Sequence, residues 1–147
     1  MYKGLLYVIS PNQYKNEEIV QLIKEHPEIQ YVSLAGIDFA GNDTDEKIPI
    51  SAFLNDMDSF FSGAAVQTDG SSVVLHGIAT LNNGKVDLVA DPDVKWVIDY
   101  NWQNIDPILN KPVGSLRIPA FLRHDNKMVD LRSILKNTLA YVKKELI

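Results

Sequence analysis

Apolar residues recur at every second position in two neighbouring stretches, and this feature constrains the fold more than any other. Val86, Leu88 and Ala90 make the first stretch, and the same period returns in residues 94–100 after the turn at 91–93. A period of two is typical of a strand with one buried face. Because such a sheet must be covered by another layer, we expect a mixed sheet of four or five strands with helices on one face, an α+β fold.

Two other stretches have the apolar spacing of amphipathic helices. These are residues 16–26 and 51–62, in which apolar side chains repeat every three or four positions. We expect Asn16 and Ser51 to cap their first turns and Gly63 to end the second helix. These two helices are the predicted cover of the sheet.

Turn sequences predict which strands are neighbours. Residues 29–39 are rich in β-branched and aromatic types and indicate a strand with a kink at Gly36. The polar sequence at 41–46, followed by Lys-Ile-Pro-Ile, predicts a hairpin with that strand. Asn-Asn-Gly-Lys at 82–85 predicts a second hairpin.

The C-terminal part is expected to form a separate unit. Residues 101–115 contain two prolines and a glycine with little periodicity, which is typical of a linker. We therefore divide the chain into a domain at 1–112 and a segment at 113–147 with a strand, a turn and a helix. One strand and one helix cannot enclose a core, so the segment is expected either to pack on the first domain or to be the truncated start of an α/β domain.

Composition excludes several classes of function. The chain of 147 residues has no cysteine, so neither a thiol nucleophile nor a cysteine-ligated metal is available. Its 19 acidic against 14 basic residues give a net charge of -5, which disfavours binding to nucleic acid or to an anionic membrane. No run approaches the roughly 20 apolar residues of a membrane-spanning helix. A cytoplasmic location is expected.

Several patterns resemble metal-binding or nucleotide-binding motifs but do not meet the requirements of those motifs. His26, His76 and His124 do not have the spacing that places two ligands on one helix face. The acidic loop 38–46 resembles a calcium loop, but Asp43 stands where such a loop needs glycine. No phosphate-binding glycine motif is present, so no metal or nucleotide site is predicted within this chain.

Asp69-Gly70-Ser71-Ser72 is the segment with the most chemical potential. It joins one carboxylate to two hydroxyls beside a glycine that permits close approach of another group. A carboxylate with neighbouring hydroxyls can hold a small cation such as ammonium and accept its proton. The same residues also suit an ordinary polar turn in which they bond to the local backbone.

The order of motifs from residue 29 to residue 147 resembles the start of glutamine synthetase. The resemblance rests on the Asp-Gly-Ser-Ser signature together with Lys47, Pro49, Asp87 and the turn at Pro92-Asp93, and continues into the tail 116–142. It implies a β-grasp domain followed by the first strand and helix of a catalytic domain. In that family Asp69 would bind and deprotonate ammonium, and Ser72 would assist.

The activity implied by the resemblance is ATP-dependent ligation of ammonia to glutamate with Mg or Mn as cofactor. The metal- and phosphate-binding segments of the family are missing from this sequence, so we expect a fragment that is inactive alone and binds no cofactor. Its implied partners are the missing catalytic domain and neighbouring subunits of a homo-oligomer, with ammonium and glutamate as substrates. The alternatives are a free-standing β-grasp module that binds a protein, and a related glutamate–amine ligase.

Overall fold

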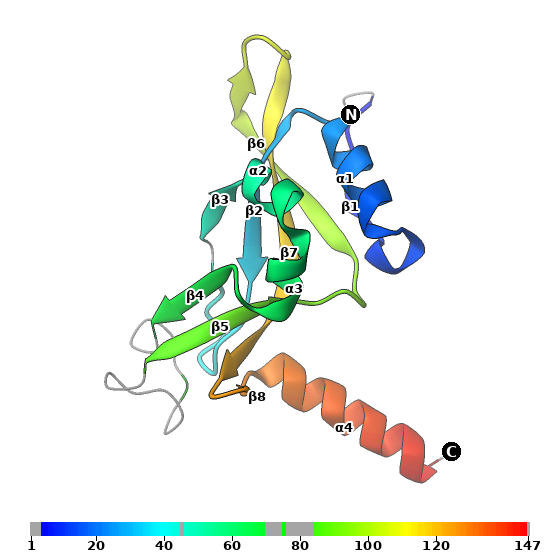
Figure 1. Ribbon diagram of the computed structural model, residues 1–147, viewed down its shortest axis with the longest axis vertical. Coiled ribbons are helices and arrows are strands. Elements are labelled where there is room, and N and C mark those ends of the chain that lie inside the picture. The colour runs from blue at the N-terminus through cyan, green and yellow to red at the C-terminus, as the bar shows by residue number, and fades with distance from the viewer. Residues whose placement is uncertain (1–3, 45, 70–74, 76–83, 147) are drawn as a thin grey trace.

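Figure 1 shows the computed structural model, which describes residues 4–44, 46–69, 75 and 84–146. Its elements follow in the order β1 (Val8–Ile9), a 3-10 turn (Pro11–Gln13), α1 (Asn16–Lys24), β2 (Ile29–Ala35), β3 (Lys47–Pro49), α2 (Ile50–Asn55), α3 (Met57–Ser62), β4 (Val66–Asp69), β5 (Lys85–Ala90), β6 (Trp96–Asp106), β7 (Lys111–His124), β8 (Lys127–Met128) and α4 (Leu131–Leu146).

Strand β7 is the centre of one mixed sheet. Its first half lies between β6, to which it is antiparallel, and β2, to which it is parallel. Its second half bonds to β5 and β8, and the outer strands β1, β3 and β4 extend the sheet. The described residues form eight strands, more than the four or five expected, because β1, β3 and β8 are too short to show a period in the sequence.

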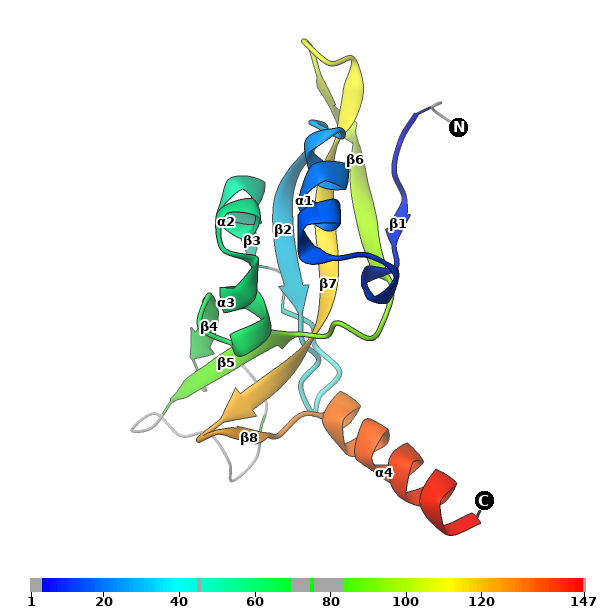
Figure 2. The same cartoon turned by 45° about the vertical axis from the view of Figure 1, so that its right-hand side comes forward.

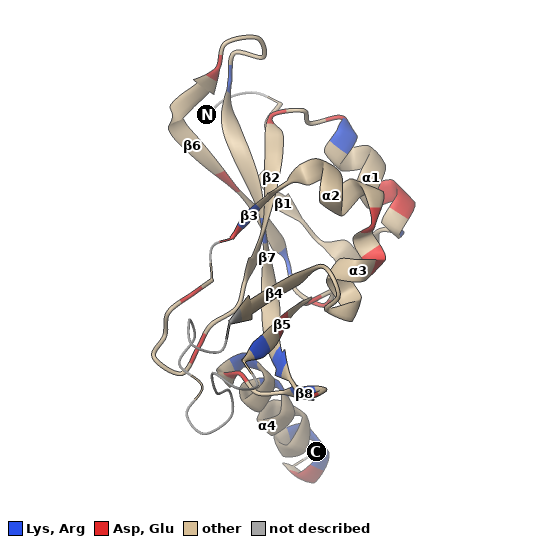
Figure 3. Cartoon of the chain, turned by 60° about the vertical axis from the view of Figure 1, so that its left-hand side comes forward, with Lys and Arg blue, Asp and Glu red and all other residues tan. Residues whose placement is uncertain are grey.

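The helices α1, α2 and α3 cover one face of this sheet, as Figure 3 shows and as the alternating strands predict. The arrangement is the expected α+β class and is consistent with a β-grasp domain. Buried apolar residues from both layers form one core, with the fully buried Trp96, Phe53 and Phe60 among its largest side chains.

The first residue of α1 and the continuity of the predicted helix 51–62 differ from expectation. Helix α1 starts one residue early, because the backbone N–H of Lys15 donates to the Glu18 carboxylate at 2.8 Å, and Asn16 is already helical. The predicted helix 51–62 is broken at Asp56 into α2 and α3. The Asp56 carboxylate, rather than Ser51, provides a cap by accepting the N–H of Ser59.

The predicted linker is a long hairpin. Residues 101–106 belong to β6 and residues 111–115 to β7, with a turn at 107–110. The two strands pair from Val97 opposite Arg117 to Asp106 opposite Lys111, with an irregularity between Asn101 and Ile105. Pro112 and Gly114 are tolerated within β7, and the expected boundary at 112 falls inside that strand. Strand residues beyond 112 therefore complete the first sheet, because their hydrogen bonds run to β2, β5 and β6.

Helix α4 extends away from the sheet instead of packing on it, as the two views in Figures 1 and 2 agree. Two successive residues with positive φ, Asp125 and Asn126, form the tight turn before it, as the sequence His-Asp-Asn-Lys predicts. Its apolar stripe is exposed, with Leu135 59% and Leu139 51% accessible. None of the helices among the described residues is long and apolar enough to cross a membrane.

Candidate functional site

Of the two residues predicted to bind ammonium, the structure describes only the backbone of Asp69. Asp69 is the last residue of β4, and its backbone is opposite Lys85 of β5. Ser72, with the rest of the Asp-Gly-Ser-Ser signature and the hairpin at 82–85 up to Asn83, lies outside the described residues. The described part of this region consists of the residues that hold β4 and β5 in the sheet.

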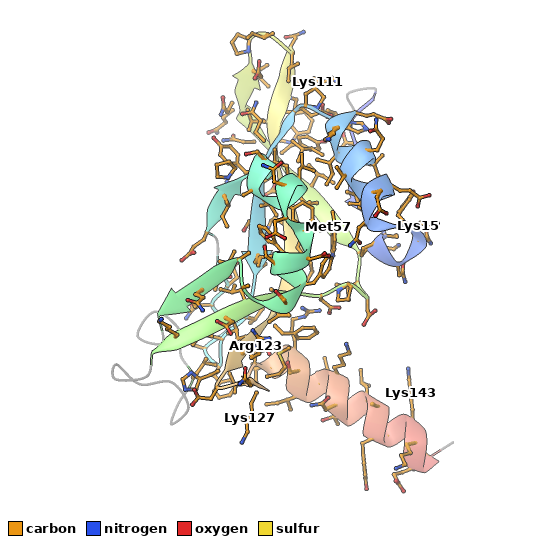
Figure 4. The ribbon with its side chains drawn as sticks, in the orientation of Figure 1. Lys15, Met57, Lys111, Arg123, Lys127 and Lys143 are labelled. Carbon is orange, nitrogen blue, oxygen red and sulfur yellow. The ribbon has the colours of Figure 1, made fainter. Side chains whose placement is uncertain are left out.

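A row of three polar side chains crosses β4, β5 and β7 next to Asp69. The side-chain amide of Gln67 donates to Asp87 Oδ1 at 2.7 Å, and Asp87 Oδ2 accepts from Arg123 Nε at 3.1 Å and Nη2 at 2.9 Å. These residues stand directly opposite one another on β4, β5 and β7. The row binds edge strand β4 to the central strand, and Figure 4 shows Arg123 at this place.

Gly63 makes room for the arginine of this row. It ends α3 with φ of +80°, as the sequence predicts for the terminating glycine. A Cβ atom at Gly63 would stand 2.6 Å from Arg123 Nη2 and 3.0 Å from Val89 Cγ2. A side chain there would be strained and would also displace the guanidinium from Asp87.

We expect Gly63→Ala to lower the free energy of unfolding by about 2–3 kcal/mol, of which about 1–2 kcal/mol is the backbone cost of φ > 0. Gly41→Ala is the matched control, since Gly41 has φ of +81° and nothing within 4 Å of its added Cβ. Urea unfolding of both variants measures the difference. Equal losses would show that the contact with Arg123 has no energetic weight.

The other residues behind the family resemblance lie apart from this row. Lys47 and Pro49 are on β3, opposite Ser33 and Tyr31 of β2. Lys47 helps to line an open hollow of about 440 Å³ on the face of the sheet that the helices leave uncovered; its walls come from β2, β3, β6 and β7. The hollow has both polar and apolar lining residues, and no motif in the sequence predicts it.

A buried carboxylate at the opposite end of the sheet is a site that sequence reasoning missed. Glu28 is fully buried; its Oε1 lies 2.8 Å from His26 Nδ1, and its Oε2 lies 3.6 Å from Lys111 Nζ and has no hydrogen bond. The pKa of Tyr100 is raised above its ordinary value. The larger cause is burial of the hydroxyl, and the second is the nearby negative charge of Glu28. The ion pair joins the α1–β2 turn to the turn end of the β6–β7 hairpin, where β7 begins and where Figure 4 labels Lys111.

We expect Lys111→Met to destabilise the fold by about 1–3 kcal/mol, because it leaves the buried Glu28 carboxylate without its cation. The estimate is at the low end for buried pairs, since the Lys111 side chain is 33% exposed. In a Glu28→Gln background the same change should cost less than about 1 kcal/mol. A double-mutant cycle by urea unfolding measures the coupling, and additive effects would contradict it.

The two histidines that the structure describes and the acidic loop have structural partners. His124 Nδ1 lies 3.0 Å from the carbonyl oxygen of Lys85, and His76 lies outside the described residues. Asp38 is buried, and its Oδ1 accepts the backbone N–H groups of Ala40 and Asn42 at 3.0 and 2.9 Å. Within the described ranges no three His, Asp or Glu side chains are grouped so that they could hold a metal ion.

Comparison with known proteins found neither a matching family model nor a matching curated sequence. Solved structures do match. The chain aligns with glutamine synthetase from Plasmodium falciparum (TM-score 0.64, 19% identity, 90% of this chain), with a GmaS–ADP complex (0.62, 15%, 86%) and with GmaS without ligand (0.61, 16%, 84%). The fold is that of glutamine synthetase structures. The expected resemblance to glutamine synthetase is confirmed at the level of the fold.

The extent of these matches is as informative as their quality. The chain spans 23–25% of the length of each of the three structures, although 84–90% of its own residues align. The likeness therefore concerns one part of much larger chains. At 15–19% identity it shows the fold alone.

Proposed function

We propose that this chain is the β-grasp part of a glutamine synthetase-type ligase, which joins ammonia to the γ-carboxylate of glutamate at the expense of ATP. One observation carries the proposal: 84–90% of the chain takes the fold of about a quarter of such structures. The Asp-Gly-Ser-Ser signature of the sequence supports it, and its first residue, Asp69, ends strand β4. We assign to the chain a wall of the active site.

In this proposal Asp69 is the catalytic residue of the chain. Ammonium has no free electron pair, so it must lose a proton before its nitrogen can attack carbon. The Asp69 carboxylate would hold ammonium by charge and accept that proton, after which ammonia displaces phosphate from the activated γ-carboxyl group of glutamate. Ser72 would assist by a hydrogen bond. The chemistry follows from the residue types and from the family resemblance.

The chain would act together with a neighbouring subunit of a homo-oligomer. Among the described residues, β4 pairs only with β5 and thus forms an edge of the sheet. Its last residue is Asp69. We propose that a second subunit approaches the end of this edge strand and supplies the rest of the active site.

Among the described residues no three His, Asp or Glu side chains are grouped so that they could hold the Mg or Mn that such a ligase uses with ATP. In this proposal the catalytic domain of the ligase would hold the nucleotide and the metal.

We expect calorimetric titration of the 147-residue chain with ATP and Mg²⁺ to give no binding at micromolar concentrations. A phosphate cradle and a ligand set are both needed for tight binding of a metal–nucleotide complex. The complete ligase, titrated under the same conditions, is the positive control. Micromolar binding by the chain alone would show that a nucleotide site lies within it.

A free-standing β-grasp module that binds a protein is the second candidate. The exposed apolar stripe of α4 favours it, because contiguous exposed apolar surface marks interaction sites. The two candidates differ in what they require of Asp69. A binding module needs no proton acceptor there, whereas the ligase, with ammonia or another amine as nucleophile, does.

A further inference from the structure

The start of α4 is attached to the turn at 91–93 by an ion pair with one buried partner. Arg132 Nη2 donates to Asp91 Oδ2 at 2.7 Å, and its Nη1 lies 3.4 Å from the carbonyl oxygen of Ala120. The Asp91 side chain is 3% exposed and that of Arg132 is 26% exposed. Because water is largely excluded from the carboxylate, this pair is screened less than a surface pair.

Asp91 is held in place before the helix contacts it. Its backbone N–H donates to the carbonyl oxygen of Pro119, and its own carbonyl oxygen accepts the indole N–H of buried Trp96 at 2.9 Å. Its Oδ1 accepts the N–H of Asp93, which closes the turn. The Oδ2 atom that receives Arg132 therefore has a fixed position relative to the core.

A second, outer contact lies one helical turn further along. Lys136 Nζ is 3.3 Å from Asp93 Oδ2, with side chains 56% and 68% exposed. Arg132 Cζ and Lys136 Nζ lie 4.9 and 5.1 Å from the centre of the Phe121 ring. An exposed pair of this kind contributes about 0–1 kcal/mol, so the pair with Asp91 is the stronger constraint on the helix.

Beyond Lys136, no contact between α4 and the other described elements is comparable. Residues 137–146 are all exposed, and Figure 4 shows Lys143 far from the sheet. A helix rises about 1.5 Å per residue, so a rotation of about 20° at Arg132 would move the far end of this 16-residue helix by about 8 Å. Small changes at the first turn therefore have a large effect on where the apolar stripe lies.

We propose that the Asp91–Arg132 pair is a positioning contact that sets the direction of α4 relative to the sheet. It links the helix to the turn that begins β6 and, through Trp96, to the core. The direction of the helix fixes where its exposed apolar stripe lies relative to the sheet. This inference goes beyond the proposed ligase function and does not depend on it.

Distance measurement between two spin labels tests the proposal directly. The chain has no cysteine, so Val97→Cys on β6 and Ala140→Cys on α4, both exposed positions, give one labelled pair. Pulsed electron spin resonance on the unaltered pair should give one narrow distance distribution. In the Asp91→Asn/Arg132→Met background, which removes the pair without leaving a lone buried charge, the distribution should broaden or shift by more than about 5 Å.

Two further variants keep the test decisive. Arg132→Lys retains the positive charge but loses the two-pronged contact with Asp91 and Ala120, and should also broaden the distribution. Lys136→Met removes only the outer pair and should leave it narrow. Trp96 fluorescence and thermal unfolding check that each variant is folded. A distribution that stays narrow in both Arg132 variants would overturn the proposal and assign the helix direction to the preceding turn alone.

Discussion

Asp69→Asn in the complete ligase is expected to lower ammonium-dependent turnover by about 10²- to 10⁴-fold. The change preserves shape and one hydrogen-bonding oxygen, but it removes the charge that holds ammonium and the base that takes its proton. Steady-state kinetics at varied ammonium concentration measures the loss. Because Asp69 contacts neither nucleotide nor glutamate in the proposal, the Michaelis constants for those two substrates should change little.

Two variants show whether the loss belongs to Asp69. Ser72→Ala should cost less, since a neutral hydrogen bond contributes about 0.5–1.5 kcal/mol, equivalent to roughly a 2- to 13-fold change. Asp93→Asn is a control of the same chemistry at an exposed turn, where the Asp93 side chain is 68% exposed. Unchanged kinetics for Asp69→Asn would assign Asp69 to a polar turn and favour the binding module.

Trp96→Ala is expected to lower the free energy of unfolding of the chain by about 3–5 kcal/mol, the usual range for loss of a buried tryptophan. Trp96 is fully buried, and its ring lies 5.9 Å from the rings of Phe53 and Phe61, between the sheet and the helices. The substitution creates a cavity there and leaves the carbonyl oxygen of Asp91 without its donor. Urea unfolding followed by circular dichroism measures the loss.

The second tryptophan provides a matched control. Trp102 is 50% exposed on the β6–β7 hairpin, so Trp102→Ala should cost less than about 1 kcal/mol. Trp96→Phe should fall between the two, since it retains most of the packing and loses the hydrogen bond. If Trp96→Ala and Trp102→Ala were equally destabilising, the core between sheet and helices would not be centred on Trp96.

The sequence determined the parts of the fold that depend on local pattern. The two-residue period of β5 and β6 fixed which side chains are buried, because a shift by one residue would turn every apolar group to water. The turn before β3 and Gly63 after α3 were predictable for a similar reason, since polar turn residues and positive φ are local requirements. The class of fold and its layers followed from these signals.

Only the tertiary structure decided what depends on contacts between distant residues. The sequence of residues 101–115, taken by itself, is typical of a linker. In the structure this segment contributes to β6 and β7, because β2, β5 and β6 supply strand partners along β7. Nothing local predicts that Gln67, Asp87 and Arg123 align in one row, or that Glu28 is buried beside Lys111. The direction of α4 is of the same kind: its period marks a helix, but the contact of Arg132 with Asp91, 41 residues earlier, lies between elements that only folding brings together.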